Sequence, residues 1–267
     1  MPTFSFGEDT LFFEESGEGD PVVFLHGLLH RNWMQARLAE RASENFRAIA
    51  LEFSGHGRST SVADPKKYSL ARFADEVRAL LDHLEIEKAV VHGTSLGANV
   101  LVEGLPRFPD RLAGAVIEMP VLARGATIAM ALFKPLAFTL DHTGPVVRAL
   151  HRLASPIPRS NPNLAILLDL IPANPRQAAS VLWGLIESTE ETDLGIFSSL
   201  DVPALVIAHP HDPLHEFNDS VELAAALPRG ELLEARSMLE LRFAPDRLWP
   251  RVEAFYQRCF ETATGDS

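Results

Sequence analysis

Apolar residues follow two alternating patterns along this chain: short unbroken runs, and longer segments with helical spacing. The unbroken runs predict buried strands over residues 22–25, 46–53, 89–92, 112–119 and 203–209. Helical spacing predicts a helix over 69–84, whose apolar face carries Phe73, Val77, Leu80, Leu81 and Leu84. Strands of this kind alternating with helices are typical of a parallel sheet with both faces covered.

The two ends of the chain complete this pattern. Residues 4–13 predict two strands around a turn at Gly7, a hairpin that can edge a larger sheet. A helix over 218–227, a last strand over 231–235 and a final apolar helix are expected near the other end. Residues 263–267 are predicted to be a disordered tail.

The alternation stops between residues 121 and 199. No strand is evident there, prolines recur, and apolar helical pieces are predicted over 126–139, 146–153, 164–170 and 177–186. This segment is interpreted as a helical cap inserted into a core formed by residues 1–120 and 200–262.

Composition narrows the classes of partner. The 24 basic and 36 acidic residues give a net charge of −12, which argues against nucleic acid or an anionic membrane as the main partner. The single cysteine, Cys259, excludes an internal disulfide, fits a reducing cytoplasm and is expected to be a packed residue. No basic leader with an apolar core opens the sequence, and no apolar run approaches the ~20 residues that cross a bilayer. We therefore expect a cytoplasmic protein.

Candidate chemistry centres on Gly93-Thr-Ser-Leu-Gly97, which follows a predicted strand and precedes a helix-like run. Gly-x-Ser-x-Gly in this context is the nucleophile elbow, a turn so tight that its serine has a strained backbone and only small neighbours fit. The pattern predicts that Ser95 is a nucleophile beside a helix N-terminus, where negative charge is favoured.

The chain resembles the α/β-hydrolase fold family. The resemblance rests on the elbow together with Phe24-Leu-His-Gly-Leu28, Leu51-Glu-Phe-Ser-Gly-His-Gly-Arg-Ser59 and Pro203-Ala-Leu-Val-Ile-Ala-His-Pro-His-Asp212. It implies an eight-stranded, mostly parallel sheet, a helical cap, and an active site between them. It also implies an oxyanion hole from the Leu28 and Leu96 backbone N–H groups and a catalytic acid at Asp212, with Glu118 as a weaker alternative acid.

The resemblance is incomplete at the general base. The family's histidine lies on the loop after the last strand, here about residues 236–243, and this loop contains no histidine. Three explanations stay open. Another histidine substitutes, with His215 the best candidate because Asp212-Pro-Leu-His215 would form a turn; the protein binds a ligand without hydrolysing it; or Glu240 acts as the base. Other candidate histidines are His209 and His211 on the same loop and His142 and His151 in the cap.

The predicted cap helix over 126–140 is apolar around nearly its whole circumference, so it could line an apolar pocket through Met130, Phe133 and Phe138. The favoured function is a serine hydrolase acting on a small or medium, largely apolar ester, thioester or lactone. The alternatives are a ligand-binding protein that has lost catalysis and a lyase or cyclase. No metal or organic cofactor is implied, and an apolar cap surface leaves a homodimer open.

Overall fold

A computed structural model describes residues 2–28, 33–158, 164, 168, 171–188, 192–210, 212 and 214–264. Its centre is an eight-stranded sheet in the order β1-β2-β4-β3-β5-β6-β7-β8. The strands are β1 (Thr3–Phe6), β2 (Asp9–Ser16), β3 (Pro21–Leu25), β4 (Arg47–Glu52), β5 (Ala89–Thr94), β6 (Leu112–Glu118), β7 (Ala204–Ala208) and β8 (Gly230–Glu234). The pairs β1–β2 and β2–β4 are antiparallel and all the other pairs are parallel, so the predicted eight-stranded, mostly parallel sheet is confirmed.

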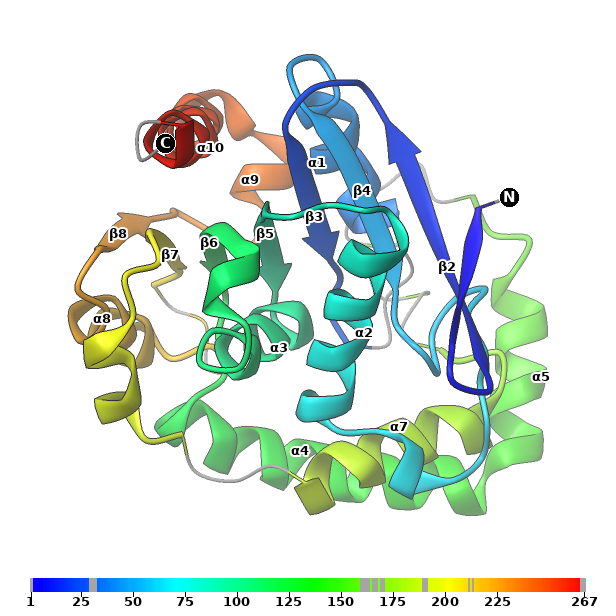
Figure 1. Cartoon of the computed structure of the whole chain (residues 1–267). Helices are drawn as coiled ribbons and strands as arrows, with labels where there is room; N and C mark the ends of the chain where they lie inside the picture. Colours follow the sequence, from blue (N-terminus) through cyan, green and yellow to red (C-terminus); the bar gives the residue numbers. More distant parts are fainter. Residues whose placement is uncertain are drawn as a thin grey trace.

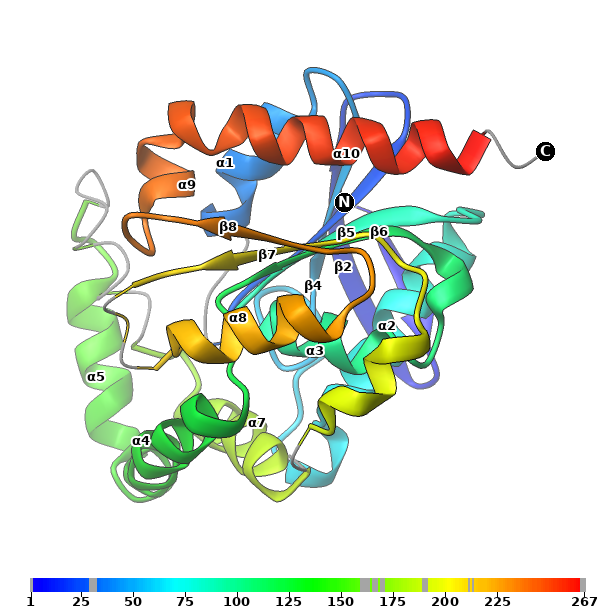
Figure 2. The same cartoon turned by 90° about the vertical axis from the view of Figure 1, so that its left-hand side faces the viewer.

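Helices cover both faces of the sheet, as Figure 2 shows. On one face lie α1 (Trp33–Ala42) and α10 (Trp249–Thr264), and on the other lie α2 (Leu70–His83), α3 (Leu96–Gly104) and α8 (Phe217–Ala226). A short helix, α9 (Glu240–Phe243), precedes α10, and single 3₁₀ turns occur at Pro65–Lys67, Pro109–Arg111, Leu194–Ser199 and Pro245–Arg247. The pattern of apolar positions does not predict α1, and the segment of α9, expected to be a loop, is a short helix.

Local sequence explains the helix that packs beside the elbow. The Ser69 side chain accepts a hydrogen bond from the Arg72 backbone N–H and caps the start of α2. The predicted apolar face of α2 is buried against the sheet, where Phe73 and Leu80 are fully enclosed.

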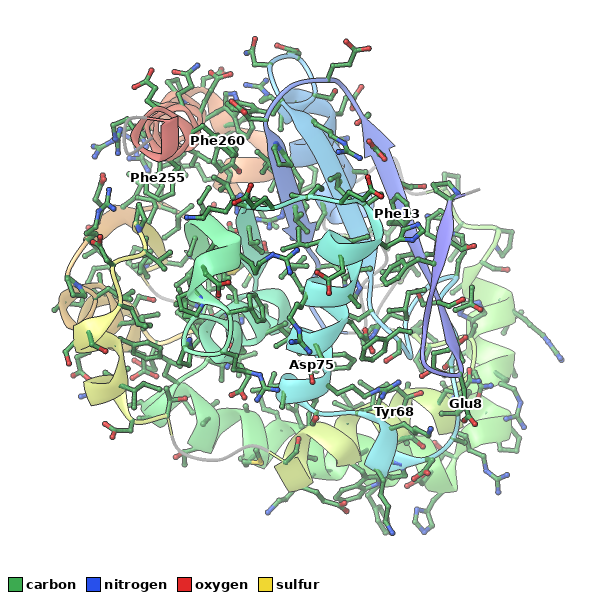
Figure 3. The ribbon with its side chains drawn as sticks, viewed as in Figure 1. Glu8, Phe13, Tyr68, Asp75, Phe255 and Phe260 are labelled. Atoms are coloured by element: carbon green, nitrogen blue, oxygen red, sulfur yellow. The ribbon has the colours of Figure 1, made fainter. Side chains whose placement is uncertain are left out.

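On the opposite face Phe255 lies on α10 over the sheet, with Cys259 buried one turn further along; burial raises the pKa of this thiol to about 12. Figure 3 shows Phe255 and Phe260 on α10, far from Tyr68 on the α2 and α7 side.

The helices between β6 and β7 are α4 (Ala123–His142), α5 (Gly144–Ala154) and α7 (Pro175–Ser188). They lie together beyond the carboxyl ends of the parallel strands (Figure 1). Helices α4 and α7 pack through a small apolar cluster of Ala137, Leu140, Ala178, Ala179 and Leu182. The described part of residues 121–199 contains helices and no strand, whereas of the helix predicted over 164–170 only Leu164 and Leu168 lie among the described residues.

The final helix continues to Thr264, two residues into the segment predicted to be a tail. Residues 265–267 lie outside the described residues. Of the helices that the structure describes, none combines the length and the apolar composition needed to span a bilayer.

Candidate active site

Ser95 occupies the bend between β5 and α3 with a backbone φ of 52° and ψ of −109°, a conformation that is strained for a residue with a side chain. The two flanking glycines are required by space. A Cβ atom on Gly93 would lie 2.2 Å from the Gly97 carbonyl oxygen, and one on Gly97 would lie 2.4 Å from the Leu25 carbonyl oxygen. The Gly-x-Ser-x-Gly pattern therefore forms the tight strand-to-helix turn that the sequence predicts.

The side chains of Ser95, His215 and Asp212 form a hydrogen-bonded series. His215 Nε2 lies 3.1 Å from Ser95 Oγ, and His215 Nδ1 lies 2.8 Å from Asp212 Oδ2. The other carboxylate oxygen, Oδ1, accepts the backbone N–H groups of Leu214 at 3.0 Å and His215 at 3.2 Å. The loop after β7 thus supplies both the carboxylate and the imidazole, and the two side chains are hydrogen-bonded directly to each other.

The Asp212 carboxylate is suited to remain charged in this loop. Burial opposes the charged form, but the hydrogen bond from His215, its charge and the two backbone donors outweigh burial and lower the pKa of Asp212. Because the carboxylate accepts from Nδ1, the Nε2 atom is free to accept the serine proton.

The segment where the family carries its histidine has another use here. It forms α9, and its Arg242 side chain is fully buried against Glu118, at 2.7 Å for each of two parallel hydrogen bonds. Glu240 is bonded to another residue: it accepts from Arg247 Nε at 2.7 Å and from Arg247 Nη2 at 2.8 Å, and hydrogen bonding to Arg247 is the main cause of its lowered pKa. The hypothesis that Glu240 replaces the base is therefore wrong, since this carboxylate is already paired with a cation.

Glu118 is also excluded as the partner of the imidazole. Its two oxygens are taken by Arg242 and by the Thr94 hydroxyl, and the described contacts of His215 run to Asp212 and Ser95. Although burial disfavours its charged form, Arg242 holds the pKa of Glu118 well below the ordinary value.

The remaining candidate histidines have other surroundings. His26, in the turn after β3, accepts the Phe53 N–H through Nε2 and so connects this turn to the residue after β4. His209 is buried with Nε2 3.8 Å from Glu118, and burial lowers its pKa. His142 and His151 contact carbonyl oxygens of the cap, at Phe138 and Ile171. His211 lies outside the described residues.

The two predicted oxyanion donors border the same space as Ser95. Leu96 begins α3, and Leu28 follows β3 directly after His26 and Gly27. The Gly97 N–H donates to the His26 carbonyl at 3.1 Å, which ties the turn after β3 to the first turn of α3. Leu28 and Leu96 both line the same cavity as Ser95.

This cavity lies between the sheet and the helices α4 and α7, and its volume is about 540 Å³ when its opening to solvent is included. Its lining is apolar apart from two residues, Ser95 and Asn99. The Asn99 amide is occupied, because it donates to the Val121 carbonyl at 2.6 Å and accepts the Val121 N–H at 2.9 Å. The apolar lining consists of Leu28, Leu70, Leu96, Val121, Ala126, Ala129, Met130, Phe133, Leu185 and Ile186.

Two of the three predicted pocket residues, Met130 and Phe133, line this cavity. The prediction for Phe138 is wrong. Its side chain is 57% exposed and stacks on His142 with ring centroids 3.9 Å apart, on the outer side of α4. Residues five apart in a helix point in directions more than a right angle apart, so Phe133 and Phe138 cannot share one face.

Sequence reasoning missed Arg242 and Thr94, which surround Glu118 below the serine. Glu118 carried a signal, since a carboxylate ending a long apolar strand must find a partner when buried. Nothing in Leu239-Glu-Leu-Arg-Phe243 identifies Glu118 as the partner of Arg242, because the two residues are 124 positions apart in the chain.

Comparison with known proteins finds similarity to one family. A family model described as alpha/beta hydrolase fold matches residues 20–145. Among curated relatives, an α/β-hydrolase superfamily protein of Bacillus subtilis is 31% identical over 44% of this chain and 42% of its own length. A bifunctional esterase/perhydrolase of Acinetobacter calcoaceticus is 34% identical over 40% of each chain. The matches thus span less than half of these two relatives.

Solved structures resemble the chain over nearly its whole length. The enol-lactonase of Burkholderia xenovorans superposes with a TM-score of 0.77 over 95% of this chain and 99% of that one, at 22% identity. At this identity the likeness establishes the α/β-hydrolase fold and leaves the reaction to the residues of the site.

Proposed function

Because the chain has the α/β-hydrolase fold and a family model of that description matches residues 20–145, we propose that it is a serine hydrolase whose general base is His215, supplied by the loop after β7. One observation carries the proposal: a continuous series from Ser95 Oγ to His215 Nε2 at 3.1 Å and from His215 Nδ1 to Asp212 at 2.8 Å. An alcohol needs a base within hydrogen-bonding reach before it can attack a carbonyl.

In this reaction Ser95 Oγ attacks the substrate carbonyl while its proton passes to His215 Nε2. Asp212 stabilises the imidazolium that forms. The backbone N–H groups of Leu28 and Leu96 hold the negative oxygen of the tetrahedral intermediate, each worth about 3 to 4 kcal/mol in acyl transfer. The imidazolium then protonates the leaving oxygen or sulfur as the carbonyl bond to it breaks. A water molecule, deprotonated by the same histidine, attacks the acyl-enzyme and releases the acid.

The cavity supports an apolar acyl group as the part of the substrate held under the cap. Its apolar side chains favour hydrocarbon burial at ~25 cal/mol per Å². A charged acyl group would find no cation among the residues that line it, and the Asn99 amide is already satisfied by Val121. We therefore propose small or medium apolar esters, thioesters or lactones as substrates.

A fluorophosphonate tests the proposal, because its reaction needs the same serine and base. Ser95 Oγ bonds to phosphorus, the P–F bond breaks, fluoride leaves, and the Oγ proton passes to His215. We expect an adduct on Ser95 in the parent and a labelling rate lowered by ~10⁴-fold or more in His215→Ala. His151→Ala is the matched control, because His151 contacts the Ile171 carbonyl oxygen. This variant should be labelled at the parent rate.

Three results decide the matter. An unlabelled parent at every pH between 6 and 9 contradicts the hydrolase proposal and favours a binding protein. Labelling of His215→Ala at the parent rate removes His215 from the mechanism. Equal slowing in His215→Ala and His151→Ala attributes the effect to general loss of structure.

A further inference from the structure

A buried cluster of charge and hydroxyl lies directly beneath the serine. The Arg242 guanidinium donates to both Glu118 oxygens and, through Nη2, to the Thr94 hydroxyl, each at 2.7 Å. Thr94 in turn donates to Glu118 Oε2 at 2.8 Å. The side chains of Arg242 and Glu118 have no exposed surface. One arginine from α9 therefore connects the last residue of β5 to the last residue of β6.

Each of these strand ends is followed by a residue in a strained conformation. Ser95 follows Thr94 with a φ of 52°, and Met119 follows Glu118 with a φ of 57°. The two bends are also bonded to each other, because the Ser95 N–H donates to the Glu118 carbonyl at 2.9 Å. A positive φ in a residue with a side chain costs of order 1–3 kcal/mol and persists only where the surroundings enforce it.

We propose that Arg242 is a positioning residue, which fixes the bend carrying Ser95 by clamping Thr94 and Glu118 together. The inference rests on the proposed hydrolase function, since its role is to hold the nucleophile in line with His215. Arg242 reaches this place from the segment where the family resemblance implied a histidine. This segment would therefore act on Ser95 by fixing its position and not by transferring a proton.

Stability alone is a weak reason for such a pair. Removing two charges from water costs about as much as their attraction returns, and well-packed apolar residues often replace a buried ion pair without loss of stability. An apolar replacement lacks the direction of a bidentate hydrogen bond. Position and stability can therefore be separated by experiment.

The informative variant replaces the whole cluster by apolar side chains: Thr94→Val, Glu118→Leu and Arg242→Met combined. No unpaired charge remains in this variant. Burial lowers the pKa values of the neighbouring His92 and His209, and the Glu118 charge, which raises them, is removed, so both imidazoles stay neutral. Arg242→Lys and Arg242→Met are made alongside. Arg247→Gln is the control, because Arg247 is 40% exposed and its ion pair with Glu240 of α9 does not include Thr94 or Glu118.

The readouts are the urea midpoint and the fluorophosphonate constants kinact and KI. We expect the triple variant to keep a near-parent midpoint and KI and to lose roughly 10- to 100-fold in kinact, as a displacement of ~1 Å does. Arg242→Lys should recover part of the kinact lost in Arg242→Met. Arg247→Gln should match the parent in kinact.

An unchanged kinact in the folded triple variant overturns the inference and leaves the hydrolase proposal intact. Should the triple variant not fold, Thr94→Val and Arg242→Lys decide: parent kinact in both overturns it, and a lowered kinact at parent KI supports it. An unlabelled parent is a different result, because it removes the proposed function itself.

Discussion

Replacing Asp212 by asparagine changes one atom and should disable the imidazole. In the parent, Asp212 Oδ1 accepts the Leu214 and His215 backbone N–H groups, and Oδ2 accepts from His215 Nδ1 at 2.8 Å. The asparagine oxygen can keep the two backbone bonds only if its NH₂ group takes the Oδ2 position. That group donates, so Nδ1 must accept, and the ring proton moves to Nε2, which then faces Ser95 Oγ with no lone pair.

The loss expected in kcat is about 10⁴-fold, equivalent to ~5 kcal/mol, because the same wrong tautomer has that effect in serine proteases. Stability should change little in Asp212→Asn, since both backbone bonds are kept. Asp212→Ala should lose activity and also about 1–3 kcal/mol of stability, because the Leu214 and His215 N–H groups lose their acceptor.

The assay is hydrolysis of p-nitrophenyl butyrate, with urea unfolding in parallel. A kcat for Asp212→Asn within tenfold of the parent refutes the tautomer reasoning and Asp212 as the orienting acid. Equal destabilisation of the asparagine and alanine variants would show that the backbone bonds are not kept, and the kinetic loss would then reflect a disordered loop.

Two further predictions concern the cap and the core. A Cβ on Gly125 would lie 2.6 Å from the Leu214 carbonyl oxygen, so Gly125→Ala should displace the His215 loop and lower kcat ~10²-fold with a near-parent KM in the same assay. Gly144→Ala is the control and should match the parent, because the nearest atom to its Cβ is the flexible end of Arg148 at 3.4 Å. Burial raises the pKa of Glu76 to about 7, above its unfolded value, so its contribution to stability is present at low pH and is lost as pH rises from about 4.5 through 7. Urea unfolding should therefore show the stability of Glu76→Gln rising relative to that of the parent by roughly 2 to 3 kcal/mol between pH 5 and pH 8, and a constant difference would contradict this.

The sequence by itself determined the features that depend on neighbours in the chain. Unbroken apolar runs identified the strands because a strand buried on both faces needs them. The glycines around Ser95 identified the bend because no larger residue fits, and the short separation of Asp212 and His215 made one turn enough to join them. The helix missed at α1 has few large apolar residues, with Leu38 alone between positions 35 and 42, and its place over the sheet comes from packing.

Tertiary structure alone decided what meets across long stretches of chain. His215 reaches Ser95 over 120 residues, and Arg242 reaches Glu118 over 124. Composition equally permitted Glu240 as the residue of α9 that serves the site, and the apolar circumference of α4 permitted Phe138 as a cavity residue. Apolar spacing shows which residues share a helix face, but the docking of the helix decides which face is covered, and buried charges find partners only once the sheet has assembled them.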